Sequence, residues 1–328
     1  MRVGMNPQKS EGFISLTSKH RMIMVCYIPD FSDYYQASFE VLQLCVESAI
    51  KTFNAHGKIT LVNNGSCAAV QTYFNTLFAS GQIDSVIHHQ ENMGKIDAMM
   101  QAARGVREEY ITFSDTDILF KNGWQDAVEL LLDSYPDIGS VSPISVRNTH
   151  SYVTVATMRK LLRGKYRFYY ESLPQNMEDY NRFLLSINWK PIEDVQVKWP
   201  VIDLGAHKVL MGGGHSVVTI RRSIVRDFVP KDPTLILIGK HSVYNYIDLP
   251  VDLAGKMRVS TYANWAYHMG NAPDAWMHDI QKDNQAAPQT PYTPPVFQQG
   301  KMIDYKTFWY KIQKEVFKKL FFLRYPNP

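Results

Sequence analysis

The sequence predicts an α/β fold, in which a doubly wound and mostly parallel sheet carries helices on both faces. Short apolar runs alternate with stretches of helical periodicity from residue 21 onward, which is the pattern of successive βα units. Right-handed crossovers would bring the carboxyl ends of these strands to one edge of the sheet. A length of 328 residues with 45% hydrophobic content suits one large α/β domain with additions.

The first half of the chain is interpreted as four βα units in order. The expected strands are Met22–Ile28, Lys58–Val62, Ser85–His88 and Tyr110–Ser114, and the expected helices are Tyr34–Phe53, Cys67–Ser80 and Lys95–Ala103. The turns that follow the strands lie near Pro29-Asp30, Asn63–Ser66, Gln90–Lys95 and Ser114–Asp117. Because ligands of such sheets gather at the carboxyl ends of strands, the four turns are expected to line one crevice.

The second half is less regular. Residues 144–206 alternate poorly and are expected to form an insertion over the sheet, which is a candidate acceptor region. A predicted strand at Lys208–Met211 leads to three glycines at 212–214, which permit a sharp turn or the close approach of a ligand. The remaining expected elements are a short helix from Arg221, a segment at Asp248–Ala254 and a β-like run at Arg258–His268.

Cysteine usage and hydropathy indicate a cytoplasmic protein. Cys26, Cys45 and Cys67 have no metal-binding spacing and leave an odd thiol if two of them pair, which argues against a secreted disulfide framework. No apolar run approaches the roughly 20 residues that cross a bilayer, and the N-terminus lacks the apolar core of a signal peptide.

The C-terminal segment differs from the rest of the chain. Residues 301–328 contain seven Lys or Arg and two acidic residues, so they carry a net charge of +5 and the other residues sum to −1. Apolar residues recur there at three- and four-residue intervals, which predicts a basic amphipathic helix. Such a helix either lies at the inner face of a membrane as a peripheral contact or packs on the rest of the protein or a second copy of it.

The expected organisation follows from these patterns. Residues 1–20 are an N-terminal extension, 21–283 the main domain, 284–300 a Pro-rich linker and 301–328 the basic helix. No nucleic-acid partner is expected, and a homo-oligomer is compatible with the sequence.

The segment Tyr110–Asp117 carries the clearest chemical signal, because its apolar strand ends in Asp115 and Asp117. Carboxylates one residue apart at a strand end suit Mg²⁺ or Mn²⁺, which prefer oxygen ligands and keep positions for substrate phosphates. The alternative is a pair of capping carboxylates before the helix near Trp124.

The chain resembles the nucleotide-sugar glycosyltransferases of the GT-A (Rossmann-like) fold, most closely those of glycosyltransferase family 2. The similarity covers about residues 20–275. The segments that carry it are Val25–Pro29, Leu61–Ser66, Asn92–Lys95, Tyr110–Asp117, Gly212–Gly214 with Arg221-Arg222, Asp248–Arg258 and Tyr267–Gly270. The resemblance implies a metal-dependent, inverting transfer of a sugar from a UDP-sugar to a hydroxyl of a glycan or lipid-linked acceptor, as in surface polysaccharide synthesis.

The resemblance also implies a set of donor-binding residues. Pro29 and Asp30 would lie beside the nucleotide base, and Asn64 would contact base or ribose where many relatives have Asp. Otherwise Asn63-Asn64-Gly65 is only a turn, since Asn and Gly tolerate left-handed dihedrals.

Phosphate and metal ligands follow from the same resemblance. Asn92, Gly94 and Lys95 precede a helix whose backbone N–H groups and lysine would meet phosphate, or Asn92 is only an N-cap. Asp117 would bind the metal directly, Asp115 would contact ribose or metal-bound water, and His268 would be a further metal ligand. Otherwise His268 is a packed or capping histidine.

The catalytic base does not follow directly from the resemblance. The family supplies it from an adjacent acidic pair, but here Leu249 and Pro250 occupy that place. Asp252 is therefore preferred as the base, with Asp248 second, while helix capping is the alternative for either. His215 and Trp265 are candidates for the border of the acceptor pocket.

Two other functions compete with this one. A nucleotidyltransferase normally needs a Gly-rich phosphate loop after the first strand, which the segment from Pro29 to Asp33 does not offer. A non-catalytic nucleotide-sugar or glycan binding module is favoured by the missing acidic pair and disfavoured by the intact Asp115 and Asp117.

Overall fold

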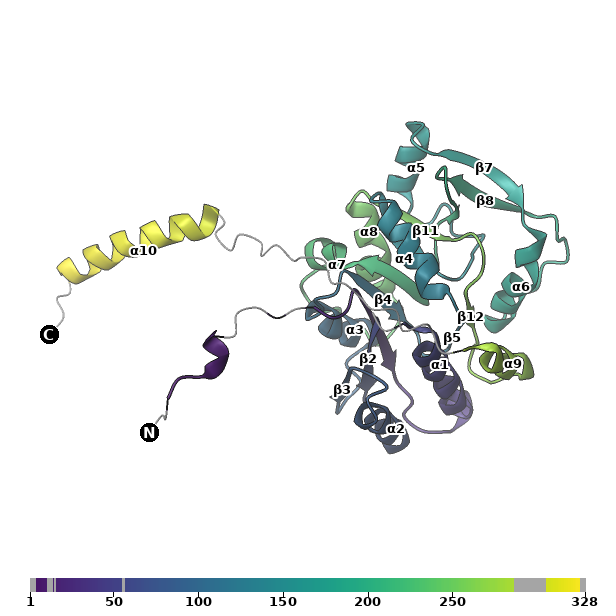
Figure 1. The fold of residues 1–328 in the computed structure, drawn as a ribbon, viewed down its shortest axis with the longest axis horizontal. Coiled ribbons are helices and arrows are strands. Elements are labelled where there is room, and N and C mark those ends of the chain that lie inside the picture. Colours follow the sequence, from purple (N-terminus) through teal and green to yellow (C-terminus); the bar gives the residue numbers. More distant parts are fainter. Residues whose placement is uncertain (1–3, 11–13, 15, 55–56, 286–304, 325–328) are drawn as a thin grey trace. The chain divides into compact units, whose positions relative to one another are not determined.

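The computed structural model describes residues 4–10, 14, 16–54, 57–285 and 305–324 (Figure 1). The chain divides into two compact units, Met1–Tyr292 and Thr293–Pro328. Most of the expected linker, 284–300, lies outside the described residues. Within the described part, no helix combines the length and apolar character that a bilayer crossing requires.

The strands and helices of the first unit alternate along most of its length. Its strands are β1 (His20–Cys26), β2 (Gly57–Asn64), β3 (Ser85–His89), β4 (Tyr110–Ser114), β5 (Ile118–Phe120), β6 (Ile138–Ser142), β7 (Arg167–Ser172), β8 (Lys198–Asp203), β9 (Lys208–Met211), β10 (Val217–Arg221), β11 (Met257–Thr261) and β12 (Ala266–His268). Its α-helices are α1 (Ser38–Thr52), α2 (Ala68–Ala79), α3 (Lys95–Arg104), α4 (Trp124–Ser134), α5 (Val155–Leu162), α6 (Met177–Ser186), α7 (Arg222–Phe228), α8 (Leu249–Leu253) and α9 (Ala275–Asp283). The second unit contains α10 (Tyr305–Arg324).

A ten-stranded sheet forms the centre of the first unit. Its strand order is β3-β2-β1-β4-β10-β6-β11-β9-β8-β7, while β12 and β5 form a separate antiparallel pair. Strands β3, β2, β1, β4, β6, β11 and β8 run in one direction, and β10, β9 and β7 run in the other. The expected α/β fold with a mostly parallel sheet is therefore confirmed.

Side chains of β1 alternate between the two faces of the sheet, as a strand's pleat requires. Met22, Met24 and Cys26 join the core cluster beneath α1, α2 and α4. Ile23 and Val25 join the cluster beneath α3, α7 and α8. Helices thus cover both faces, which leaves the strand ends as the place where polar groups of several elements meet (Figure 1).

Three local expectations differ from the structure. Asn63 and Asn64 continue β2 and are buried instead of forming the turn, which begins at Gly65 with φ +80°. The run Arg258–His268 is split between β11 in the large sheet and β12, which pairs with β5. Residues 144–206 do more than lie over the sheet, because β7 and β8 extend one of its edges.

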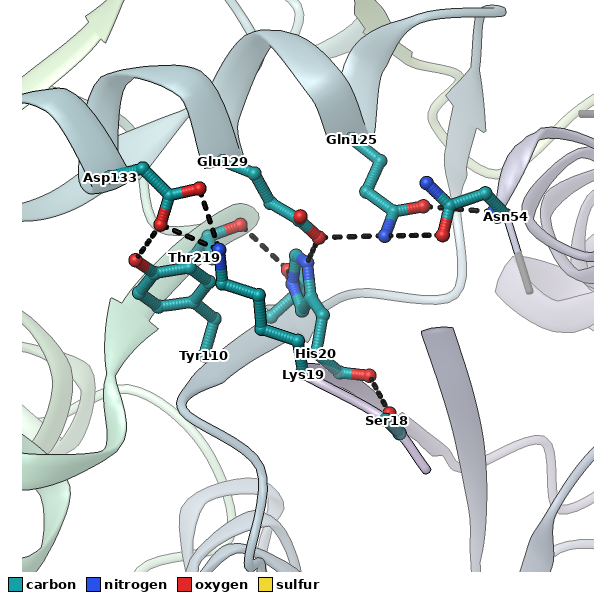
Figure 2. Close-up of polar contacts among 10 residues, drawn as sticks. Ser18, Lys19, His20, Asn54, Tyr110, Gln125, Glu129, Asp133 and Thr219 are labelled. Atoms are coloured by element: carbon teal, nitrogen blue, oxygen red, sulfur yellow. Dashed lines mark hydrogen bonds and ion pairs between the residues drawn. The ribbon is translucent and has the colours of Figure 1, made fainter. Parts of the chain in front are cut away.

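A buried polar network ties β1 to α4 on the first face (Figure 2). His20 is fully buried, with Nδ1 2.8 Å from Oε1 of Glu129 and Nε2 2.6 Å from Oγ1 of Thr112. Gln125 donates to the same Glu129 oxygen at 2.7 Å. Burial acts to raise the pKa of Glu129, but the hydrogen bond and charge of His20 outweigh it and lower that pKa.

We expect Glu129→Gln to make unfolding easier at neutral pH. An acid whose pKa is lowered by folding adds stability above its ordinary pKa of 4.5, and this contribution disappears as the pH falls through the folded value. The free energy of unfolding should drop by about 1–3 kcal/mol at pH 7, as for a lost hydrogen bond to a charged group. Urea unfolding from about pH 7 to about pH 3 should show the two free energies of unfolding converging as the pH falls below 4.5.

Glu178→Gln is the control for that experiment, because Glu178 forms only an exposed pair with Arg182 at 2.6 Å. Glu178→Gln should change the free energy of unfolding by no more than about 0.5 kcal/mol. If the free energy of unfolding differed between wild type and Glu129→Gln by the same amount at every pH, the carboxylate charge would contribute nothing to stability.

Candidate functional site

A cavity of about 450 Å³ opens at the carboxyl ends of β1, β2 and β4, which is within the usual size range of small-molecule sites. The residues lining it include Asn64, Asn92, Lys95, Asp115 and Asp117. These come from three of the four turns that were expected to share a crevice. The lining residues from the first turn region are Tyr27 and Ile28, and neither Pro29 nor Asp30 is among them.

The carboxylate pair lies where β4 ends. Ser114 is the last residue of β4, and the backbone N–H of Asp115 donates to the carbonyl of Ser216, just before β10, at 2.7 Å. Asp117 immediately precedes β5, and the Asp117 side chain is 29% exposed. The two aspartates are thus fixed from both sides by strands and point at the cavity instead of capping α4.

His268 is brought to Asp117 by the pairing of β12 with β5. His268 is opposite Ile118 in the ladder, and the backbone N–H of Met269 donates to the carbonyl of Asp117 at 2.8 Å. As a result Nε2 of His268 lies 3.4 Å from Oδ2 of Asp117, while Nδ1 lies 2.9 Å from Oγ of Ser186. A polar partner on the second ring nitrogen is the usual way in which a metal-binding imidazole is oriented.

The site fits a divalent cation in part. Oδ1 of Asp117 is buried and has no hydrogen-bond partner among the residues that the structure describes. Burial raises the pKa of this carboxyl, while His268 and Lys95 oppose that change. Within the described ranges, no three side chains of His, Cys, Asp or Glu converge as a ready metal site. Asp117 and His268 would therefore need oxygens of a bound ligand to complete a coordination shell.

The start of α3 presents a lysine to the cavity but few free backbone donors. Lys95 forms an ion pair with Asp115 through its ammonium group, and its backbone N–H donates to the carbonyl of Leu237 at 3.0 Å. The N–H of Gly94 donates to the side chain of Asn92 at 2.9 Å. These two backbone donors already have partners, and binding of phosphate by Asn92, Gly94 and Lys95 stays a prediction.

Asn64 is buried beside the cavity and holds the neighbouring turn. It donates from Nδ2 to Oδ1 of Asn92 at 2.9 Å and accepts at Oδ1 from the N–H of Met93 at 3.1 Å. Asp30 is turned to solvent, where hydrogen bonds from Ser32 lower its pKa. These contacts give the side chains of Asn64 and Asp30 hydrogen-bond partners in their own turns. Nucleotide binding by Asn64 and Asp30 stays a prediction.

Sequence reasoning missed two groups that line the cavity. Tyr27, Tyr34 and Tyr35 form an aromatic cluster, with ring centroids of Tyr27 and Tyr35 6.1 Å apart and those of Tyr34 and Tyr35 5.2 Å apart. Leu237 and Ile238 reach the cavity from a loop that the sequence left unassigned. The tyrosines were detectable, since three of them closely follow the first strand, but Leu237 and Ile238 carried no local signal.

The two candidate bases have different surroundings. Asp252, on α8, accepts hydrogen bonds from the backbone N–H groups of Val155 and Ala156 at 3.2 and 2.6 Å, so it caps the start of α5. Asp248 is 1% exposed and lies 2.6 Å from the guanidinium of Arg258. Neither is among the residues lining the cavity. Of the two acceptor-side candidates, His215 contacts Asp248, and Trp265 packs against the first core cluster.

Comparisons with known proteins find one family model and several similar solved structures. Residues 34–188 match the model of a family described as Glycosyl transferase family 2. No curated protein matches the chain significantly in sequence. Among solved structures, the chain is similar to the mannosyltransferase PcManGT from Pyrobaculum calidifontis in complex with GDP-Man and Mn²⁺, with a TM-score of 0.45 and 12% identity over 80% of this chain and 59% of that one.

Two further structures show a similar degree of likeness. TarS of S. aureus gives a TM-score of 0.45 with 11% identity over 76% of this chain and 36% of that one. GalNAc-T7 with UDP, GalNAc and Mn²⁺ gives a TM-score of 0.46 with 13% identity over 77% of this chain and 44% of that one. The chain spans less than two thirds of the length of each of these three proteins.

Proposed function

We propose that the chain, whose residues 34–188 match the model of a family described as Glycosyl transferase family 2, is a glycosyltransferase that takes a sugar from a nucleotide diphosphate, preferably UDP. The acceptor is a hydroxyl of a glycan or lipid-linked glycan, and the transfer inverts the anomeric centre. The observation that carries this proposal is the cavity shared by Lys95, Asp115 and Asp117, where a carboxylate pair and a lysine meet an aromatic wall.

Different residues at the cavity are proposed to bind different parts of the donor. Tyrosine rings offer flat faces on which a base can stack, so the cluster of Tyr27, Tyr34 and Tyr35 is proposed to hold the base. Asp115 is proposed to bind the ribose, and the ammonium of Lys95 to bind the diphosphate. Asp117 and His268 would hold Mn²⁺ or Mg²⁺, which supplies positive charge to the diphosphate as it leaves.

A donor panel tests this proposal. Purified protein is incubated with UDP- and GDP-sugars, with water and a set of oligosaccharides as acceptors, in Mn²⁺ or in a chelator, and released nucleotide is measured. At least one UDP-sugar should release UDP only when the cation is present. Equal release in the chelator would contradict the metal assignment, and no release from any donor would contradict the function.

Residues 144–206 are proposed to form the acceptor side. This segment exposes aromatic side chains, which suit the C–H faces of sugars. They are Tyr152, Phe168, Tyr170 and Trp189.

The second unit is proposed to contact membranes. The expected helix is confirmed as α10, and every side chain described between Phe308 and Leu320 is exposed. Apolar residues such as Ile312 and Val316 share α10 with Lys311, Lys314 and Lys318. A helix of this composition binds at the interface of an anionic bilayer, where each lysine contributes about 1 kcal/mol.

Deleting residues 301–328 is expected to abolish sedimentation with anionic liposomes at low salt while leaving nucleotide release unchanged. The matched control keeps the helix and replaces Lys311, Lys314 and Lys318 by Gln, which should weaken binding to anionic vesicles by about 10²-fold if the lysines act additively. Sedimentation that fails for the full-length protein, or a deletion that unfolds the first unit, would assign α10 a structural role.

A further inference from the structure

A polar cluster outside the cavity surrounds the carboxylate of Asp248. Its Oδ1 lies 2.6 Å from Nη2 of Arg258, and its Oδ2 accepts from the hydroxyl of Tyr152 at 3.2 Å. The same Oδ2 lies 3.3 Å from Nδ1 of His215, whose side chain is 47% exposed. The cluster therefore runs from a fully buried guanidinium, through a buried carboxylate, to an imidazole that reaches solvent.

Asp248 is poorly suited to accept a proton itself. Its side chain is 2% exposed, and protonation would leave the equally buried Arg258 without its counter-charge. The imidazole is better placed. With Nδ1–H directed at Asp248, the other ring nitrogen of His215 carries a free lone pair, and the carboxylate stabilises the ring once it is protonated.

The backbone places His215 at the same edge of the sheet as the carboxylate pair. His215 precedes Ser216, whose carbonyl accepts from the N–H of Asp115 at 2.7 Å. Because β10 runs antiparallel to β4, the beginning of β10 meets the end of β4, with Val217 opposite Ser114. The backbone of His215 thus lies at the sheet edge that carries the donor site, and its half-exposed side chain borders that site without being among the residues that line the cavity.

Arg258 also fixes the chain that leads to His215. The guanidinium donates to the carbonyl of Gly213 at 3.1 Å as well as to Asp248. Gly212 has φ +89°, and a side chain there would meet the carbonyl of Thr149, so this approach needs glycine. One buried arginine therefore holds both the orienting carboxylate and the backbone before the imidazole.

We propose that His215 is the general base of the transfer and that Asp248 is its positioning residue, an inference that rests on the proposed function. The free nitrogen of His215 takes the proton of the acceptor hydroxyl as its oxygen forms a bond to the anomeric carbon. The bond from that carbon to the diphosphate oxygen breaks, and the diphosphate leaves with the electron pair. The proton then passes from the imidazole to solvent.

The test uses full-length protein and the nucleotide-sugar that gives cation-dependent nucleotide release. His215→Ala should lower kcat by roughly 10²- to 10⁴-fold, the usual contribution of a general base, with KM for the donor and Mn²⁺-dependent binding of UDP unchanged. Added imidazole should restore part of the lost rate, because His215 is exposed enough for a small base to replace it. A purely structural histidine would show no such rescue.

His278→Ala is the matched control, since its side chain is 45% exposed and lies 3.4 Å from the carboxylate of Glu40. Its rate should equal that of wild type. Asp248→Asn should lower kcat without changing UDP binding, and thermal melting reports whether this variant folds; if it does not, the His215 variant alone decides.

Three outcomes overturn the assignment. They are an unchanged kcat in His215→Ala, a loss that imidazole leaves unaltered, and a loss explained by weaker binding of UDP, which would make His215 a donor ligand. Wild-type protein that neither binds UDP with Mn²⁺ nor releases nucleotide would instead overturn the proposed function, and the base with it.

Discussion

An Asp117→Ala variant is expected to lose cation-dependent nucleotide release by at least about 10³-fold, or about 4 kcal/mol of transition-state stabilisation. Asp117 combines a buried oxygen that has no partner with a second oxygen 3.4 Å from His268. Removing this carboxylate should remove the cation and with it the charge that balances the departing diphosphate.

The fold should survive the same change. Burial raises the pKa of Asp117, which means that the folded protein disfavours the charged form, so its removal should not lower the melting temperature. Binding of UDP with and without Mn²⁺, nucleotide release and thermal melting are the measurements. Asp279→Ala, at an exposed pair with Lys282, is the control and should behave as wild type. An Asp117→Ala protein with normal turnover would disprove the cation site.

Arg258→Met is expected to cause the largest loss of stability among single changes near the site. It leaves Asp248 buried without its counter-charge and removes the donors to Gly213 and to the carbonyl of Tyr152, 2.7 Å away. Breaking a buried ion pair on one side costs about 3–5 kcal/mol. Urea unfolding monitored by circular dichroism should show the loss as a lower midpoint with a similar slope.

The double variant Asp248→Leu with Arg258→Met separates charge from packing. Replacing both members of a buried pair by apolar residues is often nearly neutral, so much of the lost stability should return. Nucleotide release should stay low in the double variant, since His215 has lost its orienting carboxylate. A double variant no more stable than Arg258→Met would attribute the loss to packing and to the backbone hydrogen bonds.

The sequence was most informative where each strand is followed closely by polar residues. Local periodicity located β1 to β4 and α1 to α3 within a few residues. Because parallel strands end at one edge, this was enough to gather Asn92, Lys95, Asp115 and Asp117 around one cavity. The turn expected at Asn63 and Asn64 was wrong, because pairing with β3 extends β2 through both residues.

The remaining features depend on partners that are distant in sequence. Strand β10 lies between β4 and β6, and nothing in Val217–Arg221 shows where it pairs or in which direction. Asp252 stands in a motif-like position, but its carboxylate is engaged by the start of α5, almost 100 residues earlier. The surroundings of Asp248 are likewise set by Tyr152, His215 and Arg258, which only the folded chain brings together.

The reversed direction of β10 also links the backbone before that strand to the end of β4. Asp115 and the segment that starts with His215 are registered by a backbone hydrogen bond of 2.7 Å between neighbouring strands. This bond ties the residue after His215 to the residue that follows β4, so a shift in the register of β10 would move His215 relative to Asp115. On another part of the cavity wall, Leu237 and Ile238 come from a loop that is held to α3 by the N–H of Lys95, which donates to the carbonyl of Leu237. The carboxylate of Asp97 holds the same loop by accepting from the backbone N–H groups of Thr234 and Leu235.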